Sequence, residues 1–182
     1  MNKSALVFGF GLSLLSACPL LDVDVDVPEV CVTFRELAVE GGPVEGGPVE
    51  PGPQTIHQSF AVDDLSQFHA ITDLDAQVAF VRGELMARSG ITDFGFVQAA
   101  RIAIRSGDDG STLPPLTLYQ CDGDCAAAGG TLAMQPDVQH DALVYLEGDS
   151  LIVDVDLTGE LPQQDWTMSV DVCFAASVHY RY

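Results

Sequence analysis

Side chains alternate between apolar and polar types along most of this chain, and a period of two is the signal of a β-strand with one buried face. In 166–180 the even positions, from Trp166 to Tyr180, are apolar, whereas most odd positions are polar. Shorter runs with the same alternation lie at 30–34, 100–104 and 151–157. Because successive side chains of a strand point to opposite faces, each run has one face suited to a core and one suited to water. The pattern predicts a fold built mainly from strands.

Two stretches depart from this alternation. In 75–90, Val78, Val81 and Leu85 have helical spacing, but Gly83 in their middle favours a bulged strand. A short helical turn is expected at 141–146. Taken together, the patterns predict an all-β protein, an antiparallel β-sandwich of about 7–9 strands, immunoglobulin-like or jelly-roll in shape.

The N-terminus has the three parts of a secretory signal peptide. Lys3 supplies a positive charge, an apolar run extends from Ala5 to Leu15, and two small residues then precede a cysteine. An apolar run of this length is too short to cross a membrane as a helix. The tetrapeptide Leu-Ser-Ala-Cys at 15–18 resembles the lipobox of bacterial lipoproteins. The resemblance implies cleavage before Cys18 and acyl chains, palmitate among them, on that cysteine, which would anchor the protein to a membrane.

Cleavage there would remove 17 of the 182 residues and leave 165, enough for one domain with a sizeable core. Lys3 would be lost with the signal peptide, so six arginines would remain against 27 acidic residues, a formal charge of −21. Nucleic acid and anionic lipid headgroups are poor partners for such a surface. The composition therefore predicts no nucleic-acid role, and the acidic charge is interpreted mainly as a solubility device.

Four cysteines remain besides Cys18: Cys31, Cys121, Cys125 and Cys173. An even number in an exported protein predicts two disulfides, for which three pairings are possible. The short 121–125 turn favours a local bridge, which would leave the other two cysteines to pair. A zinc site is the minor alternative, because one close cysteine pair has no second pair nearby.

Cys31 and Cys173 both occupy the polar parity of their expected strands. A bridge between them would set the first and last strands side by side, with both cysteines on an outer face. It would close a loop of about 140 residues and stabilise the fold by roughly 5 kcal/mol at most. The Gly/Pro-rich repeat between Val39 and Pro53 would then be an excursion within the domain, and its composition predicts a mobile loop over 39–54.

A Gly-Asp-Ser-Leu tetrapeptide at 148–151 resembles the signature of a hydrolase family with a serine nucleophile. Asp137 and His140 also have the D-x-x-H spacing of that family. The order of the two motifs is reversed here, however, and the residues after Ser150 alternate as a strand. The family places an asparagine in its oxyanion hole, and this chain has none after Asn2. We interpret the tetrapeptide as a chance match and expect no catalytic residues.

Acidic turns of the chain are candidate calcium-binding sites. Calcium takes six to eight oxygen ligands, and Asp122 and Asp124 between two cysteines are the best candidate ligands for it. No EF-hand pattern surrounds them, so solvated turns are the favoured interpretation and calcium the alternative. The four histidines, His57 among them, are scattered without metal-ligand spacing. Trp166 is expected in the core and not on a ligand platform, because it has the apolar parity.

The lipobox, the Cys-Asp-Gly-Asp-Cys turn and the C-terminal Asp-Trp-Thr-Met…Asp-Val-Cys pattern resemble uncharacterised envelope lipoproteins of myxobacteria. Pro19 stands where an aspartate would favour inner-membrane retention, so the resemblance implies the outer membrane. The predicted organisation is a signal peptide at 1–17, a lipidated N-terminus and tether at 18–29, and one β-sandwich domain at 30–182. The expected function is a non-enzymatic module of the cell envelope that binds an envelope protein or glycan or is structural. A calcium-stabilised adhesion module is the alternative, and a serine hydrolase using Ser150 is the least favoured.

Overall fold

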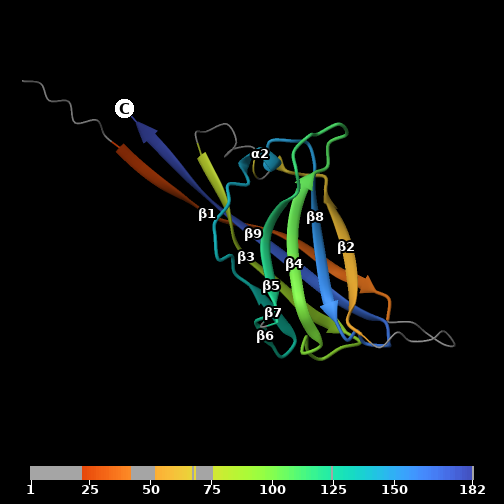
Figure 1. Cartoon of the computed structure of the whole chain (residues 1–182). Helices are drawn as coiled ribbons and strands as arrows, with labels where there is room; N and C mark the ends of the chain where they lie inside the picture. Colours follow the sequence, from red (N-terminus) through yellow and green to blue (C-terminus); the bar gives the residue numbers. More distant parts are fainter. Residues whose placement is uncertain (1–21, 42–51, 67, 69–75, 124, 182) are drawn as a thin grey trace, which may run out of the picture.

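A computed structural model describes residues 22–41, 52–66, 68, 76–123 and 125–181, and these form nine strands and one helical turn (Figure 1). The strands are β1 (Asp22–Val39), β2 (Gln54–Val62), β3 (Ala76–Ser89), β4 (Val97–Ser106), β5 (Leu116–Asp122), β6 (Ala127–Ala128), β7 (Thr131–Met134), β8 (Leu151–Gly159) and β9 (Trp166–Arg181). The helical turn, α2, covers Leu143–Leu146. The predictions of an all-β fold and of a turn at 141–146 are confirmed.

The strands pair as if one long hairpin had been folded over. Antiparallel pairing joins β4 to β5 at the middle of the chain, then β3 to β7, β2 to β8, and finally β1 to β9. Two further contacts, β3 with β9 and β4 with β8, join these pairs into sheets. One sheet has the order β1-β9-β3-β7-β6, and the other has the order β2-β8-β4-β5.

This order is that of a jelly roll, in which two Greek keys form a double sheet. The sequence left the immunoglobulin-like and jelly-roll arrangements open, and the strand order selects the second. Consecutive strands β1 and β2 lie in different sheets, as do β2 and β3 and again β3 and β4. The two sheets are called sheet A (with β1 and β9) and sheet B (with β2 and β8).

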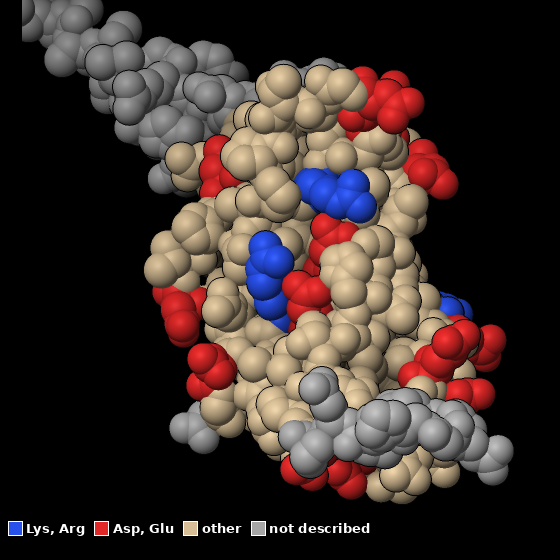
Figure 2. Space-filling model, turned by 45° about the vertical axis from the view of Figure 1, so that its right-hand side comes forward, with Lys and Arg blue, Asp and Glu red and all other residues tan. Residues whose placement is uncertain are grey.

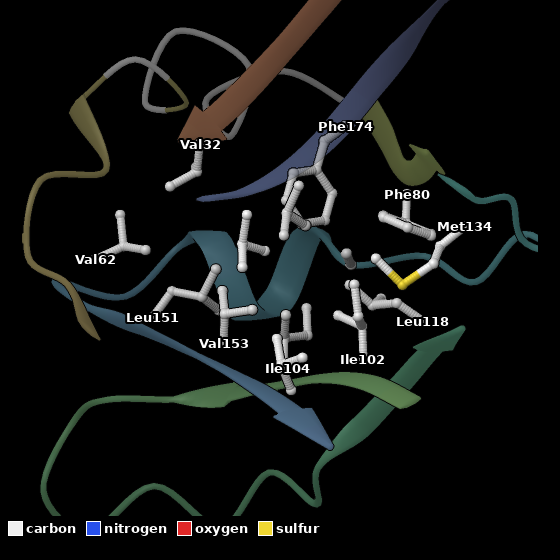
Figure 3. Packing of buried hydrophobic residues seen from close by; sticks show 14 of the residues in the cluster. Val32, Val62, Phe80, Ile102, Ile104, Leu118, Met134, Leu151, Val153 and Phe174 are labelled. Carbon is white, nitrogen blue, oxygen red and sulfur yellow. The ribbon is translucent and has the colours of Figure 1, made fainter. Parts of the chain in front are cut away.

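The core lies between the inner faces of the two sheets (Figure 3). Val32, Phe80 and Phe174 of sheet A point towards side chains of sheet B such as Ile102 and Val153. The rings of Phe80 and Phe174 pack edge to face, with centroids 6.2 Å apart. At the other end Trp166 is buried between Phe94 and Phe96, which confirms its predicted place in the core.

The ambiguous segment 75–90 is a bulged strand, as predicted. β3 shifts register against β9 between Phe80 and Arg82, and buried positions follow one parity before the bulge and the other after it. Gly83 lies just after the bulge, and its bare Cα faces the core. A Cβ there would lie 3.0 Å from Cδ1 of Ile102 and 3.2 Å from Cε of Met134. Glycine at this position therefore leaves room for the large side chains that fill the space between the sheets.

The domain begins earlier than the sequence predicted. β1 starts at Asp22 and not near Val30, and Asp22 pairs with Arg181 at the end of β9. The stretch 22–29, expected to be part of a tether, is thus the first part of β1, which extends beyond the sandwich together with β9 (Figure 1). The wrong boundary arose because Asp and Val alternate at 22–27, a strand pattern, but directly after the expected anchor. The two ends of the described chain consequently lie side by side.

The Gly/Pro-rich segment joins the two sheets. β1 of sheet A ends at Val39 and β2 of sheet B begins at Gln54, so the prediction that the segment lies within the domain is confirmed. Its residues 42–51 lie outside the described part, and so does the prediction of mobility. Among the described residues, no helix is long and apolar enough to span a membrane.

Candidate functional site

The two disulfides pair as the favoured interpretation of the sequence predicts. Cys31 of β1 bonds to Cys173 of β9, its direct neighbour across the strands, with the Cα atoms 4.0 Å apart. Both cysteines lie on the outer face of sheet A, but Cys173 is fully buried. Cys121 bonds to Cys125 across the turn after β5.

The long-range disulfide is covered by an ion pair. Arg82 of β3 contacts Glu29 of β1 at 2.7 Å, and its Nη2 donates towards Cys31 Sγ at 3.8 Å. Glu29, Cys31 and Cys173 form the one group of three possible metal ligands among the described residues. The two sulfurs are bonded to each other, and a disulfide sulfur is not the thiolate that binds a metal. We therefore assign this group a structural role.

The calcium candidates divide between described and undescribed residues. Asp122 is exposed at the end of β5, where Gly123 takes a φ of 95° and donates its N–H to the carbonyl of Gln98 at 2.8 Å. That left-handed conformation suits glycine and closes the turn between the two cysteines. Asp124 lies outside the described residues, as does the predicted lipidation site Cys18.

In the described structure, no hydrogen bond joins Ser150 to the other residues of the hydrolase-like motifs. Ser150 precedes β8, and its carbonyl accepts a hydrogen bond from the N–H of Gly107 at 2.9 Å. Asp137 and His140 instead line a small hollow with Tyr119 on β5. No hydrogen bond joins Ser150 to His140 among the interactions of the described residues. Burial, aided by the negative charge of Asp137, raises the pKa of the Tyr119 phenol, so that side chain is neutral over the physiological range.

A polar network that the sequence did not predict covers the outer face of sheet B. Asp156 of β8 accepts hydrogen bonds from His57 Nδ1 on β2 at 2.6 Å and from Arg101 on β4 at 3.3 Å. Asp154, two residues earlier, accepts from Ser59 Oγ at 2.5 Å and from Arg105 at 3.0 Å. Figure 2 shows basic and acidic side chains meeting near the middle of this face, while most other acidic side chains lie towards its edges.

Part of this network has the connectivity of a catalytic triad. Ser59 Oγ lies 3.1 Å from His57 Nε2, and His57 Nδ1 lies 2.6 Å from Asp156. In a triad the serine donates its proton to the histidine. Here the Ser59 hydroxyl donates to Asp154, which is only 8% exposed. The arrangement thus satisfies two largely covered carboxylates of β8 from the strands on both sides.

The signal for this network lay in the alternation of β8. The side chains of Asp154 and Asp156 point to the outer face of sheet B. Such carboxylates require hydrogen-bond donors, and the neighbouring strands supply them. Those strands are β2 and β4, and their partners lie 49 to 99 residues away in the chain. Without the strand order, the scattered histidines and arginines could not be matched to these carboxylates.

A groove of about 1060 Å³ lies on the outer face of sheet A. Its lining includes Arg35 and Glu36 of β1, Met86 and Arg88 of β3, and Asp171 of β9. Arg88 Nε donates to the buried hydroxyl of Ser169 at 3.0 Å, and Asp171 Oδ1 is buried without a hydrogen-bond partner among the described residues. An unpaired buried acceptor is costly, and this groove is therefore the best candidate binding site on the described surface.

Comparison with known proteins adds no functional assignment. No protein-family model and no curated protein matches this chain. Among solved structures, the decameric BFDV capsid protein has a TM-score of 0.43 at 9% identity, covering 86% of this chain and 99% of that chain. A structure of the infectious bursal disease virus Gx strain has a TM-score of 0.35 at 11% identity, covering 84% of this chain and 32% of that one. The desmodium yellow mottle tymovirus structure has a TM-score of 0.30 at 9% identity, with 100% and 96% coverage.

Proposed function

We propose that this protein is a lipid-anchored module of a bacterial cell envelope, held on the outer membrane by acyl chains on Cys18. The observation that carries the proposal is the lipobox-like tetrapeptide at 15–18, which follows a charged residue and a short apolar run. Two acyl chains give stable anchoring, because each buried methylene contributes about 0.8 kcal/mol. Two disulfides in the described domain are in keeping with an oxidising compartment outside the cytoplasm.

The short distance between the anchor and the domain supports a role close to the membrane. β1 begins at Asp22, four residues after Cys18. Fully extended residues span at most about 3.6 Å each, so this connection reaches roughly 14 Å. The jelly roll would then stand near the headgroups, with the paired ends of β1 and β9 directed at the bilayer.

We propose a binding role and not an enzymatic one. The Ser59 hydroxyl is committed to Asp154, and Ser150 has no hydrogen bond to His140 among the described residues. The groove on sheet A, by contrast, combines two arginines that form no ion pair with a described residue and the carboxylate of Asp171. Such a surface suits recognition of a polar envelope component.

Metabolic labelling tests the anchor. The full chain is expressed in a Gram-negative host with radiolabelled palmitate, and membranes are separated from the soluble fraction. We expect label on the wild-type protein and its recovery in the outer membrane. Cys18→Ala removes the acylated thiol, so this variant should lose the label and at least tenfold of its membrane-bound fraction. A variant with Cys121→Ala and Cys125→Ala is the matched control and should keep both. A labelled Cys18→Ala protein, or an unlabelled wild type, would show that the anchor is wrong.

A further inference from the structure

Two arginines, Arg35 and Arg88, do not form an ion pair with any described carboxylate. Arg82, Arg101 and Arg105 each form an ion pair, whereas Arg35 and Arg88 form none with any described residue. The chain has 27 acidic residues for 7 basic ones, so acceptors are abundant, and three of the five arginines with described side chains form an ion pair. Both unpaired arginines line the same groove on sheet A. Arg88 donates through Nε to Ser169, but neither guanidinium group is neutralised by a carboxylate of the described residues.

Two β-bulges place these arginines on either side of one segment of β9. In β1, Arg35 and Glu36 together stand opposite Ser169, between the pairs Phe34–Val170 and Leu37–Met168. In β3, Arg88 is the extra residue between the pairs Ala87–Met168 and Ser89–Thr167. A bulge adds an unpaired residue and redirects its side chain, and bulges are frequent beside functional sites.

The bulge in β1 also carries backbone strain. Glu36 has a φ of 54°, the one positive φ of a non-glycine residue in the described part of the chain. Such residues cost energy and concentrate at binding and catalytic sites. The strained pair Arg35–Glu36 is exposed on the rim of the groove, so packing against the core does not explain it.

The floor of the groove is polar and low. β9 contributes Thr167 and Asp171, which are short side chains between the longer ones of β1 and β3. The hydroxyls of Thr33, Ser89 and Thr167 also line the groove or its floor. Asp171 Oδ1 is the buried acceptor without a partner. A ligand that fits must bring a hydrogen-bond donor for Asp171 and an acidic group for the arginines.

We propose that this groove binds an acidic saccharide, with its carboxylate or sulfate on Arg35 and Arg88 and a sugar hydroxyl donated to the carboxylate of Asp171. This inference rests on the proposed binding role and names its ligand class. A guanidinium presents a planar fork of N–H donors that matches an oxyanion. A saccharide carries the acidic group and the hydroxyl donors on one compact frame. An acidic peptide fits less well, because Met86 is the one large apolar residue in the lining and offers few apolar contacts for peptide side chains.

Titration calorimetry of the full chain in detergent micelles tests the proposal. The probes are oligogalacturonate, a sulfated oligosaccharide and the neutral methyl ester of oligogalacturonate. We expect binding of the acidic probes and at least tenfold weaker binding of the ester, because it lacks the charge for the guanidinium groups. Arg35→Gln and Arg88→Gln should each weaken the binding of an acidic probe about tenfold or more, the loss typical of one charge-assisted hydrogen bond.

Arg82→Gln is the matched control. It removes the same charge from the same face, but Arg82 is paired with Glu29 outside the groove, so acidic-probe affinity should stay within twofold of wild type. Asp171→Ala should weaken binding, whereas Asp171→Asn keeps an acceptor oxygen and should restore most of it. Equal binding of the ester, tighter binding of oligoglutamate, or equal binding of inorganic sulfate alone would each overturn the proposal.

The two proposals fail separately. A protein that is labelled with palmitate and membrane-bound but does not bind either acidic probe contradicts the ligand and leaves the anchor standing. An unlabelled protein that binds oligogalacturonate through Arg35 and Arg88 contradicts the anchor and leaves the ligand standing.

Discussion

Single residues decide how closely the two sheets can approach. Gly83 is buried in β3, and Cδ1 of Ile102 in the opposite sheet lies only 3.0 Å from where a Cβ of residue 83 would be. Protein cores are close-packed, so one added methyl group must displace a neighbour. The same point applies in reverse on the outer face of sheet A, where small residues of β9 create the groove. The space beside Gly83 and the space of the groove both depend on small residues, and the hydrophobic pattern of a sequence does not reveal such space.

Replacement of Gly83 by alanine should therefore destabilise the fold through overpacking. The added Cβ would lie 3.0 Å from Cδ1 of Ile102, and relief of such a contact costs about 1 kcal/mol or more. Ile102→Val removes that Cδ1 atom and alone should cost about 1 kcal/mol. The double variant should lose less than the sum of the two single losses, by about 0.5 kcal/mol or more. Urea denaturation with both disulfides intact measures all three free energies, and strict additivity would show that the two atoms do not compete for space.

At the scale of elements, β9 organises the molecule. It lies between β1 and β3 over most of its length, carries one cysteine of the long-range disulfide and forms the floor of the groove. Its alternation made it the clearest strand in the sequence, and the parity of Cys31 and Cys173 correctly predicted that β1 is its neighbour. The bulges at Arg35 and Arg88 could not be predicted, because a bulge breaks the period of two by one residue and resembles a loss of pattern. The groove depends on those bulges and was missed for that reason.

The disulfide between β1 and β9 should stabilise the fold far more than the local one. It joins residues 142 apart, whereas Cys121 and Cys125 are 4 apart. Loop-closure entropy then assigns about 5 kcal/mol to the first bond and about 2 kcal/mol to the second. Urea unfolding should show a larger loss for the Cys31→Ala, Cys173→Ala variant than for the Cys121→Ala, Cys125→Ala variant. Cys173 is also buried, so its replacement by alanine removes packing as well as the disulfide. Reduction of the Cys121→Ala, Cys125→Ala variant breaks the long-range bond but keeps the sulfur atoms, and it therefore serves as the control. Equal losses for the two pairs would contradict this account.

At the scale of the whole molecule, the jelly roll brings together strands from opposite ends of the chain. The β1–β9 and β2–β8 pairs join the first third of the sequence to its last third. Alternation predicted the strands and the sandwich, but it was equally compatible with an immunoglobulin-like order. Pairing depends on contacts between distant segments, which one sequence read in short windows does not specify. The network around Asp154 and Asp156 was hidden for the same reason, since each hydrogen bond to these two carboxylates comes from a strand far away in sequence.

The acidic composition also acts on the whole molecule, and it should make stability depend on salt. A formal charge of −20 spread over a compact fold repels itself, and that repulsion is relieved when the chain expands. Between 10 and 150 mM NaCl the Debye length falls from about 30 Å to about 8 Å, which screens distant like charges. The arginine ion pairs on sheet B span 3.0 to 3.3 Å and are screened much less. We expect thermal unfolding to shift upwards by roughly 2–4 °C, equivalent to ~1 kcal/mol for a chain of this size.

Calorimetry at constant pH measures this shift, and sucrose at equal osmolality is the uncharged control. A variant with Asp109→Asn and Asp149→Asn, both exposed loop residues, lowers the net negative charge without touching the sheets. Its midpoint at 10 mM NaCl should be higher than that of wild type, and its increase with salt should be smaller. A midpoint that falls with added NaCl would mean that the few cross-strand ion pairs outweigh the repulsion among the 27 acidic residues. In that case the network on sheet B, and not the dispersed surface charge, would be the dominant electrostatic contribution to folding.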